Sequence, residues 1–178
     1  MFTTLYLPDF YLQAALRHQP ELSLKPVGLI DDQEKKAAII QLNRVAQENG
    51  VRIGMTPSQG LARTLELVIK VRSQSQETIL QNVLLHFAAT LSPYVEATGP
   101  GLATVQFTDP KKIAAKVTRV IEELARAEIA ARAGIAPTPD ASFLAAHLAE
   151  PVLQVEDATR FLAALPIDVL AIFPRAKS

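Results

Sequence analysis

The sequence lacks cysteine and tryptophan, and it has no long hydrophobic run. With no cysteine in 178 residues, disulfide bonds and thiolate metal sites are excluded. No stretch of 18 or more apolar residues occurs, so the sequence predicts no transmembrane span and no membrane partner. Its first residues lack the basic and small-residue pattern of a signal peptide, and we expect a cytoplasmic location.

An excess of charge of either sign is also missing. The chain has 18 Lys and Arg residues against 18 Asp and Glu residues, a formal net charge of zero. Isolated nucleic-acid-binding domains usually carry a positive excess, because much of their affinity comes from neutralised phosphates. The balance therefore argues against strong DNA binding by this chain alone, and leaves weak or shared binding open.

Apolar residues make up 49% of the sequence, enough for one sizeable core or for a core with a small additional lobe. Periodicity predicts strands at residues 3–7, 27–30, 37–42, 66–71, 94–98, 102–108 and 129–135. Helices are expected at residues 10–17, 43–49, 75–89, 139–149 and 158–164, with two more beginning after Thr56 and after Asp109-Pro110. This order predicts an α+β fold: a split βαββαβ arrangement of ferredoxin-like type, an antiparallel sheet with helices on one face, and a small inserted α/β lobe.

Local signals support several of these boundaries. Asp9 is placed as the N-cap of the first helix, and Thr56 as the cap of a helix that starts with Pro57. Gly50 suits a left-handed C-terminal cap. Gly99-Pro100-Gly101 predicts a tight turn between two strands.

Four short segments carry a resemblance to a known family. They are Leu-Pro-x-Phe from Leu7, Gly-Val-Arg-x-Gly-Met-Thr from Gly50, Val-Glu-Ala-Thr-Gly-Pro from Val95 and Gly-Ile-Ala-Pro-Thr-Pro from Gly134. In this order and at these spacings they resemble the palm and fingers of Y-family (translesion) DNA polymerases. The residues within the four segments are closest to those of the ImuB type. The resemblance covers residues 3 to about 170. It implies four parts: palm at 1–18, fingers at 19–76, palm again at 77–166, and the start of an incomplete following domain at 167–178.

Phosphoryl transfer in that family depends on two metal ions held by acidic side chains. The resemblance places Tyr6, Gly101 and Leu102 at the metal-binding positions. A phenol with a pKa of about 10 is a poor Mg²⁺ ligand, glycine has no side chain and leucine is apolar. These residues lead to the expectation that the chain is not an enzyme and holds neither a metal ion nor another cofactor.

Several other polar residues are candidates for a site. Arg44 stands where the resemblance places a nucleotide-binding Tyr, and Arg52 lies in the turn after Gly50; we expect both to bind DNA, with solvent-facing arginines as the alternative reading. The acidic group Asp31-Asp32-Glu34 indicates a solvated turn rather than a metal site. The three histidines, His18, His86 and His147, have no ligand-like spacing and read as ordinary surface or helix residues.

The resemblance implies an adaptor in translesion synthesis during induced mutagenesis. Its partners would be an error-prone replicative-type polymerase, a sliding clamp whose binding motif is not in this chain, and damaged or primer–template DNA bound weakly. Two alternatives remain. One is a ferredoxin-like small-molecule-binding or oligomerisation domain, and the other is a residual DNA-directed nucleotidyltransferase that uses Glu96 and Asp9 with Mn²⁺.

Overall fold

The computed structural model describes residues 1–32, 37–109 and 111–166. Within it the chain forms two compact units. Residues 1–7 join the chain from Asn82 onward in one unit, which we call the palm unit, and Pro8–Gln81 form the other, the fingers unit. The domain boundaries given in the sequence analysis divide the chain by the palm and fingers of the family that it resembles. They remain predictions.

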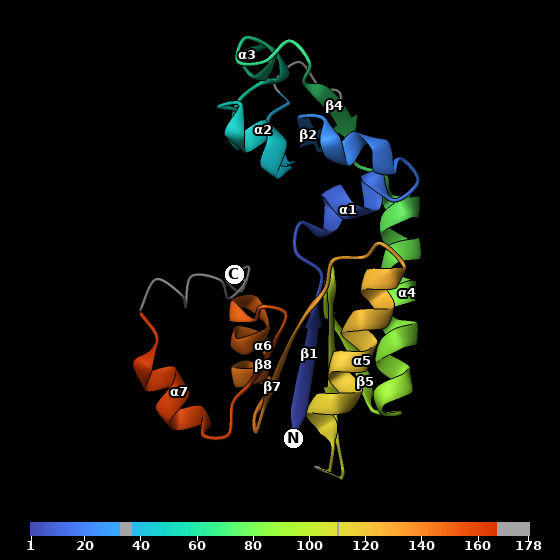
Figure 1. Cartoon of the computed structure of the whole chain (residues 1–178), viewed down its shortest axis with the longest axis vertical. Helices are drawn as coiled ribbons and strands as arrows, with labels where there is room; N and C mark the ends of the chain where they lie inside the picture. Colours follow the sequence, from blue (N-terminus) through green and yellow to red (C-terminus); the bar gives the residue numbers. More distant parts are fainter. Residues whose placement is uncertain (33–36, 110, 167–178) are drawn as a thin grey trace. The chain divides into compact units, whose positions relative to one another are not determined.

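A five-stranded sheet in the order β5-β6-β1-β7-β8 forms the palm unit (Figure 1). Its strands are β1 (Phe2–Tyr6), β5 (Val95–Gly99), β6 (Leu102–Gln106), β7 (Arg132–Ala136) and β8 (Val152–Gln154). The strand β1 is antiparallel to both β6 and β7, β5 is antiparallel to β6, and only β8 joins in parallel, beside β7. The first strand of the chain therefore lies at the centre of the sheet.

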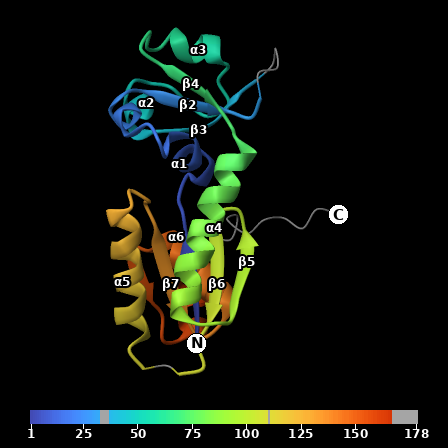
Figure 2. The same cartoon turned by 90° about the vertical axis from the view of Figure 1, so that its right-hand side faces the viewer.

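Helices cover both faces of this sheet (Figure 2). The two crossover helices, α4 (Gln74–Leu91) and α5 (Ile113–Arg126), lie on one face, where the α+β prediction places its helices. The helix α6 (Pro139–Leu148) covers the other face over β1 and β7, and α7 (Ala158–Ala164) packs its Ala158 and Phe161 near α6. The described helices include none with both the length and the apolar character needed to cross a membrane.

The contact between α6 and β7 depends on Gly134. A Cβ built on this glycine would overlap the carbonyl oxygen of Ser142 and the amide nitrogen of Ala146, both on α6. Because no side chain intervenes, the helix backbone approaches the strand directly. This close approach fixes where the last turn of α6, with His147, meets the end of the sheet.

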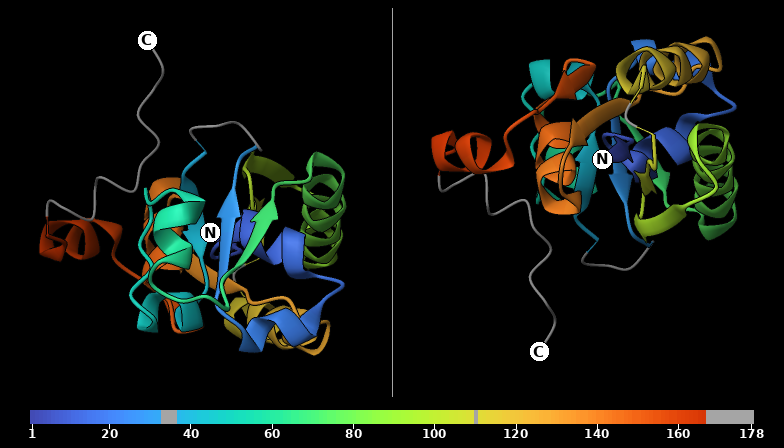
Figure 3. Two further views of the ribbon diagram at one scale, coloured as in Figure 1. Left: turned by 90° about the horizontal axis from the view of Figure 1, so that it is seen from above. Right: turned by 90° about the horizontal axis from the view of Figure 1, so that it is seen from below.

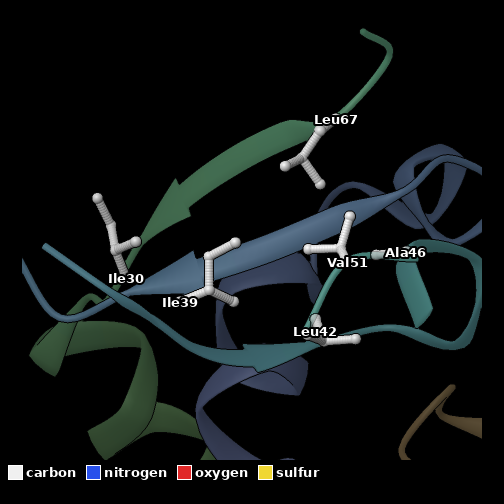
Figure 4. Close-up of a cluster of buried hydrophobic side chains, with 6 residues drawn as sticks. All are labelled: Ile30, Ile39, Leu42, Ala46, Val51 and Leu67. Carbon is white, nitrogen blue, oxygen red and sulfur yellow. The ribbon is translucent and has the colours of Figure 1, made fainter. Parts of the chain in front are cut away.

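A second, three-stranded sheet in the order β3-β2-β4 forms the fingers unit. Its elements are α1 (Phe10–Leu16), the 3₁₀ helix η1 (Pro20–Leu24), β2 (Val27–Ile30), β3 (Ile39–Leu42), α2 (Arg44–Glu48), α3 (Pro57–Leu61) and β4 (Val68–Val71). Strand β2 is antiparallel to β3 and parallel to β4, which runs beside it in Figure 3. One buried cluster fills one side of this sheet, made by Ile30, Ile39, Leu42, Ala46, Val51 and Leu67 (Figure 4).

Side-chain caps fix the short helices of this unit. The Asn43 side chain accepts a hydrogen bond from the amide of Ala46 and starts α2. Thr56 and Gln59 form a reciprocal capping box at α3, with Pro57 in the first turn, which confirms the predicted start of that helix. Gly50 has φ 82°, the left-handed conformation predicted for it.

Two expected helix starts and one expected strand start differ in detail. Asp9 does stand at the N-cap of α1, but with φ 48° its side chain makes no capping hydrogen bond, because capping geometry needs an extended backbone. Helix α5 begins at Ile113, after Lys112 with φ 57°, and Pro110 lies outside the described residues. Strand β7 begins at Arg132 rather than at residue 129, since the chain first turns at Glu128 with φ 58°.

Candidate nucleic-acid interface

The end of β1 brings together the three residues that the sequence analysis placed at the centre of the palm. Tyr6 is the last residue of β1 and pairs with Leu102 on β6. Gly101, with φ 70°, immediately precedes Leu102 and accepts a hydrogen bond from the amide of Leu7 at 2.8 Å. The three residues therefore lie together where β1 ends and β6 begins, and we call this end of the inner strands the strand-end edge of the palm sheet.

An aromatic stack covers the Tyr6 side of this edge. The rings of Tyr6 and His147 lie parallel, with centroids 4.1 Å apart and an angle of 23° between the planes. Phe143, one helical turn earlier on α6, has its ring centroid 4.4 Å from that of His147. Arg132 pairs with Tyr6 from the β7 side and donates from Nη1 to the carbonyl oxygen of His147 at 3.3 Å. Four segments therefore meet at this edge: β1, β6, β7 and the end of α6.

The surroundings of His147 favour the neutral form of its imidazole. Burial lowers the pKa of His147 below its ordinary value, and the positive charge of Arg132 lowers it further. The hydrogen bond from Nδ1 to the carbonyl oxygen of Phe143, 2.9 Å long, opposes this shift. Since the bond to the carbonyl requires a proton on Nδ1, the neutral ring carries its lone pair on Nε2.

The donor set at this edge does not fit a pair of divalent cations. A phenol, an apolar side chain and a glycine offer none of the carboxylate oxygens that Mg²⁺ prefers. Glu96 lies on β5 opposite Thr104, and Asp9 belongs to the fingers unit. In the part of the chain that the structure describes, no three acidic or histidine side chains gather as a metal site would require.

The two arginines predicted to bind DNA both lie beside one pocket of the fingers unit. The pocket has a volume of about 570 Å³ and is lined by Leu42, Gln47, Glu48, Val51, Arg52 and Ile53. Arg44 lies one helical turn before Glu48 on α2 and pairs with it at 2.7 Å. Both side chains of that pair are largely exposed, so the pair is readily exchanged for another partner.

Arg52 is held in place by backbone groups. Its Nη1 donates to the carbonyl oxygens of Gln47 and Val51 at 2.7 and 2.8 Å. The next residue, Ile53, keeps 66% of its surface exposed. A fixed guanidinium beside an exposed aliphatic side chain can contact a phosphate and an adjoining sugar or base at the same time.

The chain matches the impB/mucB/samB family over residues 5–147, which is most of its length. It belongs to that family. Among curated proteins it is 26% identical over 172 residues to DNA polymerase IV of Legionella pneumophila (strain Corby), covering 89% of this chain and 47% of the relative. It is 23% identical over 171 residues to DNA polymerase IV of Pseudomonas savastanoi pv. phaseolicola, covering 90% of this chain and 48% of that protein. The family member described here thus spans about half the length of these relatives.

Solved structures of DNA polymerases share the fold of this family member. A post-insertion binary complex of Dbh DNA polymerase matches with a TM-score of 0.82 and 17% identity, over 94% of this chain and 52% of the polymerase. DinB from Sulfolobus solfataricus matches with a TM-score of 0.82 and 16% identity, over 98% and 54% of the two chains. The predicted Y-family, polymerase-like α+β fold is therefore confirmed, while the narrower ImuB type stays a prediction.

The expectation that the chain is not an enzyme is wrong on this comparison. The curated relatives are named DNA polymerase IV, and the structural neighbours are DNA polymerases. The expectation rested on Tyr6, Gly101 and Leu102 alone. The lack of a carboxylate at three positions describes only the strand-end edge of the palm sheet. It does not define the activity class of a protein whose relatives are twice as long.

Sequence patterns alone do not reveal the residues that surround Tyr6. The spacing of His147 predicts an ordinary helix or surface residue, and no motif includes Phe143 or Arg132. The i, i+4 spacing of Phe143 and His147 on a predicted helix was a usable signal for neighbouring rings. Their contact with Tyr6, however, depends on the pairing of β1 with β7 and on the close approach at Gly134.

Proposed function

We propose that this family member supplies the palm and fingers with which a Y-family, polymerase-like protein holds primer–template DNA during repair by translesion synthesis. The observation that carries the proposal is the family match over residues 5–147, joined to a fold shared with DNA polymerases. Arg44 and Arg52, beside the pocket with the exposed Ile53, are the proposed DNA contacts.

The proposal also includes a more specific function, that of an adaptor. In that role the protein brings an error-prone replicative-type polymerase, together with a sliding clamp, to damaged DNA. Support comes from the amino-acid sequences of the four family segments, which are closest to the ImuB type. The chain spans about half the length of its curated relatives, and the clamp-binding motif that the resemblance implies is not in this chain.

Fluorescence anisotropy of a labelled primer–template, measured at about 50 and 200 mM salt, tests the DNA proposal. We expect weak binding that falls steeply with salt, because each neutralised phosphate releases counterions. Replacing Arg44 and Arg52 by Gln should weaken binding and reduce the slope of the logarithmic salt dependence by about one for each phosphate that the variant no longer neutralises. Arg63→Gln, at an exposed arginine of the same unit, is the matched control.

Two results would count against these assignments. If the chain does not bind primer–template at the lower salt concentration, it does not hold DNA by itself. Unchanged binding by the double variant would remove Arg44 and Arg52 from the interface. Primer extension measured on the same complex then asks whether bound DNA is also a substrate, as the names of the relatives indicate for those proteins.

A further inference from the structure

A second, smaller cleft lies in the fingers unit, apart from the residues proposed to contact DNA. It has a volume of about 280 Å³, and its polar lining consists of His18, Gln19, Lys70 and Gln76. Ala15, buried on α1, and the neighbours of Lys70 on β4 complete the lining. None of these residues lines the pocket beside Arg52.

Lys70 provides a fixed positive charge in this cleft. Its backbone pairs with Leu29 of β2, which sets the position of the side chain. The ammonium group donates to Oε1 of Gln19 at 2.6 Å. An ammonium group has three donors, so two remain to be directed at a ligand. The same hydrogen bond orients the Gln19 carboxamide, whose NH₂ group adds further donors.

Strand β4 contributes backbone donors at the same place. The amides of Val68 and Arg72 point toward β2, where they donate to the carbonyl oxygens of Pro26 and Ile30. Successive residues of a strand alternate in the direction of their amides. The N–H groups of the intervening Ile69 and Val71 therefore point to the outer edge of the sheet, and both residues line the cleft.

Negative charge beside the cleft is partly compensated by Arg72. The described residues that line it include no carboxylate. Glu77, next to Gln76 on α4, accepts two hydrogen bonds from Arg72 at 2.9 and 2.8 Å. Arg72 also pairs with Asp31 at 2.7 Å, so one guanidinium holds both of these carboxylates. The polar lining of the cleft consists of one ammonium group, two primary amides and an imidazole, all of which can donate.

We propose that this cleft binds a phosphate group. Its chemistry suits an oxyanion, because an ammonium, two primary amides, an imidazole and outward N–H groups can all donate to phosphate oxygens. Its volume of about 280 Å³ leaves room for a phosphate group together with part of the molecule that carries it. The phosphate comes either from a free monoester or from the backbone of a nucleic acid. The inference does not rest on the proposed DNA contacts of Arg44 and Arg52.

Isothermal titration of the full chain with inorganic phosphate at low salt tests the site. We expect saturable binding in which Lys70→Met weakens the affinity at least about tenfold, equivalent to about 1.4 kcal/mol. Gln76→Leu, at a partly exposed helix position, should weaken it less. Lys25→Met, at an exposed lysine of the same unit, should bind phosphate as the unaltered chain does.

Thymidine 5′-monophosphate and the dinucleotide TpT, used as competitors, distinguish the two sources. Displacement by the monophosphate alone indicates a free monoester, and displacement by TpT indicates a backbone phosphate. The proposal is overturned if the unaltered chain shows no saturable binding, or if folded Lys70→Met and Gln76→Leu variants both bind phosphate with unchanged affinity. Retained phosphate binding by the Arg44→Gln, Arg52→Gln double variant would separate this site from the DNA contacts.

Discussion

Thr3 and Thr4 are neighbours on β1, and both are fully buried, but their hydroxyl groups lie in opposite environments. On one face of the sheet, Oγ1 of Thr4 lies 2.8 Å from Oγ of Ser142 on α6 and 3.3 Å from Oγ1 of Thr104 on β6. On the other face, Oγ1 of Thr3 has no hydrogen-bond partner among the described residues. A buried hydroxyl without a partner lowers stability, whereas a bonded one does not.

We therefore expect the same substitution to have opposite effects at the two positions. Thr3→Val should raise the free energy of unfolding by about 1 kcal/mol, because it removes an unsatisfied polar group at nearly constant volume. Thr4→Val should lower it by about 1 kcal/mol, because the buried hydrogen bond between Thr4 and Ser142 is lost, although Ser142 still donates to the carbonyl oxygen of Pro139. Urea denaturation followed by circular dichroism measures both. A loss of stability in Thr3→Val would show that its hydroxyl is satisfied in solution.

The stack on Tyr6 predicts a pH dependence. The folded state lowers the pKa of His147 below the unfolded value of about 6.5. Below a pH of about 6.5 the unfolded chain binds a proton at His147 more readily than the folded chain does. The contribution of the neutral imidazole to the free energy of unfolding is therefore fully present above this pH, and it is lost as the pH falls toward the pKa of the folded state. We expect an NMR titration of the His147 ring to give a midpoint below 6.5.

His147→Gln provides the comparison for this prediction. The variant should lose the part of the acid destabilisation that comes from the imidazole, so the difference in stability between the two proteins should narrow below neutral pH. A constant difference across the titration would mean that His147 does not couple folding to protonation.

At the scale of elements, the contact between β7 and α6 is the most sensitive to substitution. Gly134→Ala should lower the free energy of unfolding by at least about 1–3 kcal/mol, because the added methyl group meets the backbone of α6, which cannot rotate away. Thermal unfolding measures the change. Gly99→Ala is the matched control, since its Cβ meets only the flexible Leu102 side chain at 3.2 Å. Equal losses in the two variants would contradict a special role for Gly134.

Elements with strong local signals were predictable from the sequence. The strand Val27–Ile30, the helix Ala158–Ala164 and the capped start of α3 all lie where periodicity and capping residues placed them. Strand β8 was not predicted, because three residues carry too little periodicity and are held by pairing with β7. Short-range signals therefore locate elements that satisfy their own hydrogen bonds, and they fail where a distant strand supplies the partner.

The candidate site was predictable only in part, for the same physical reason. The meeting of Tyr6 and Leu102 followed from a resemblance to a family rather than from periodicity. The ring of His147 comes from a residue far along the chain, and no local pattern encodes that contact. Lys70 on β4 and Gln19, which precedes η1, likewise come together only because both segments belong to one unit.

For the whole molecule, two units with separate buried clusters predict separate responses to core substitutions. Ile39, in the cluster of the fingers unit, and Ile135, in the palm sheet, are both fully buried. Ile39→Ala and Ile135→Ala should each cost about 2–5 kcal/mol. In native-state hydrogen exchange, we expect the first to lower protection in Pro8–Gln81 and the second in the palm unit. Equal loss of protection in both units after either substitution would indicate one cooperative body.

The order of the palm sheet has a consequence for self-association. Strand β5 forms one border of the sheet, and an open border can template the addition of a strand from another copy, the first step of aggregation. Two features oppose this here. Glu96, the second residue of β5, places an exposed carboxylate on this strand, and the ladder to β6 shifts register between Glu96 and Gly99, which disturbs the regular spacing that an incoming strand needs. The charge and the irregular ladder of β5 thus oppose edge-to-edge growth of the sheet.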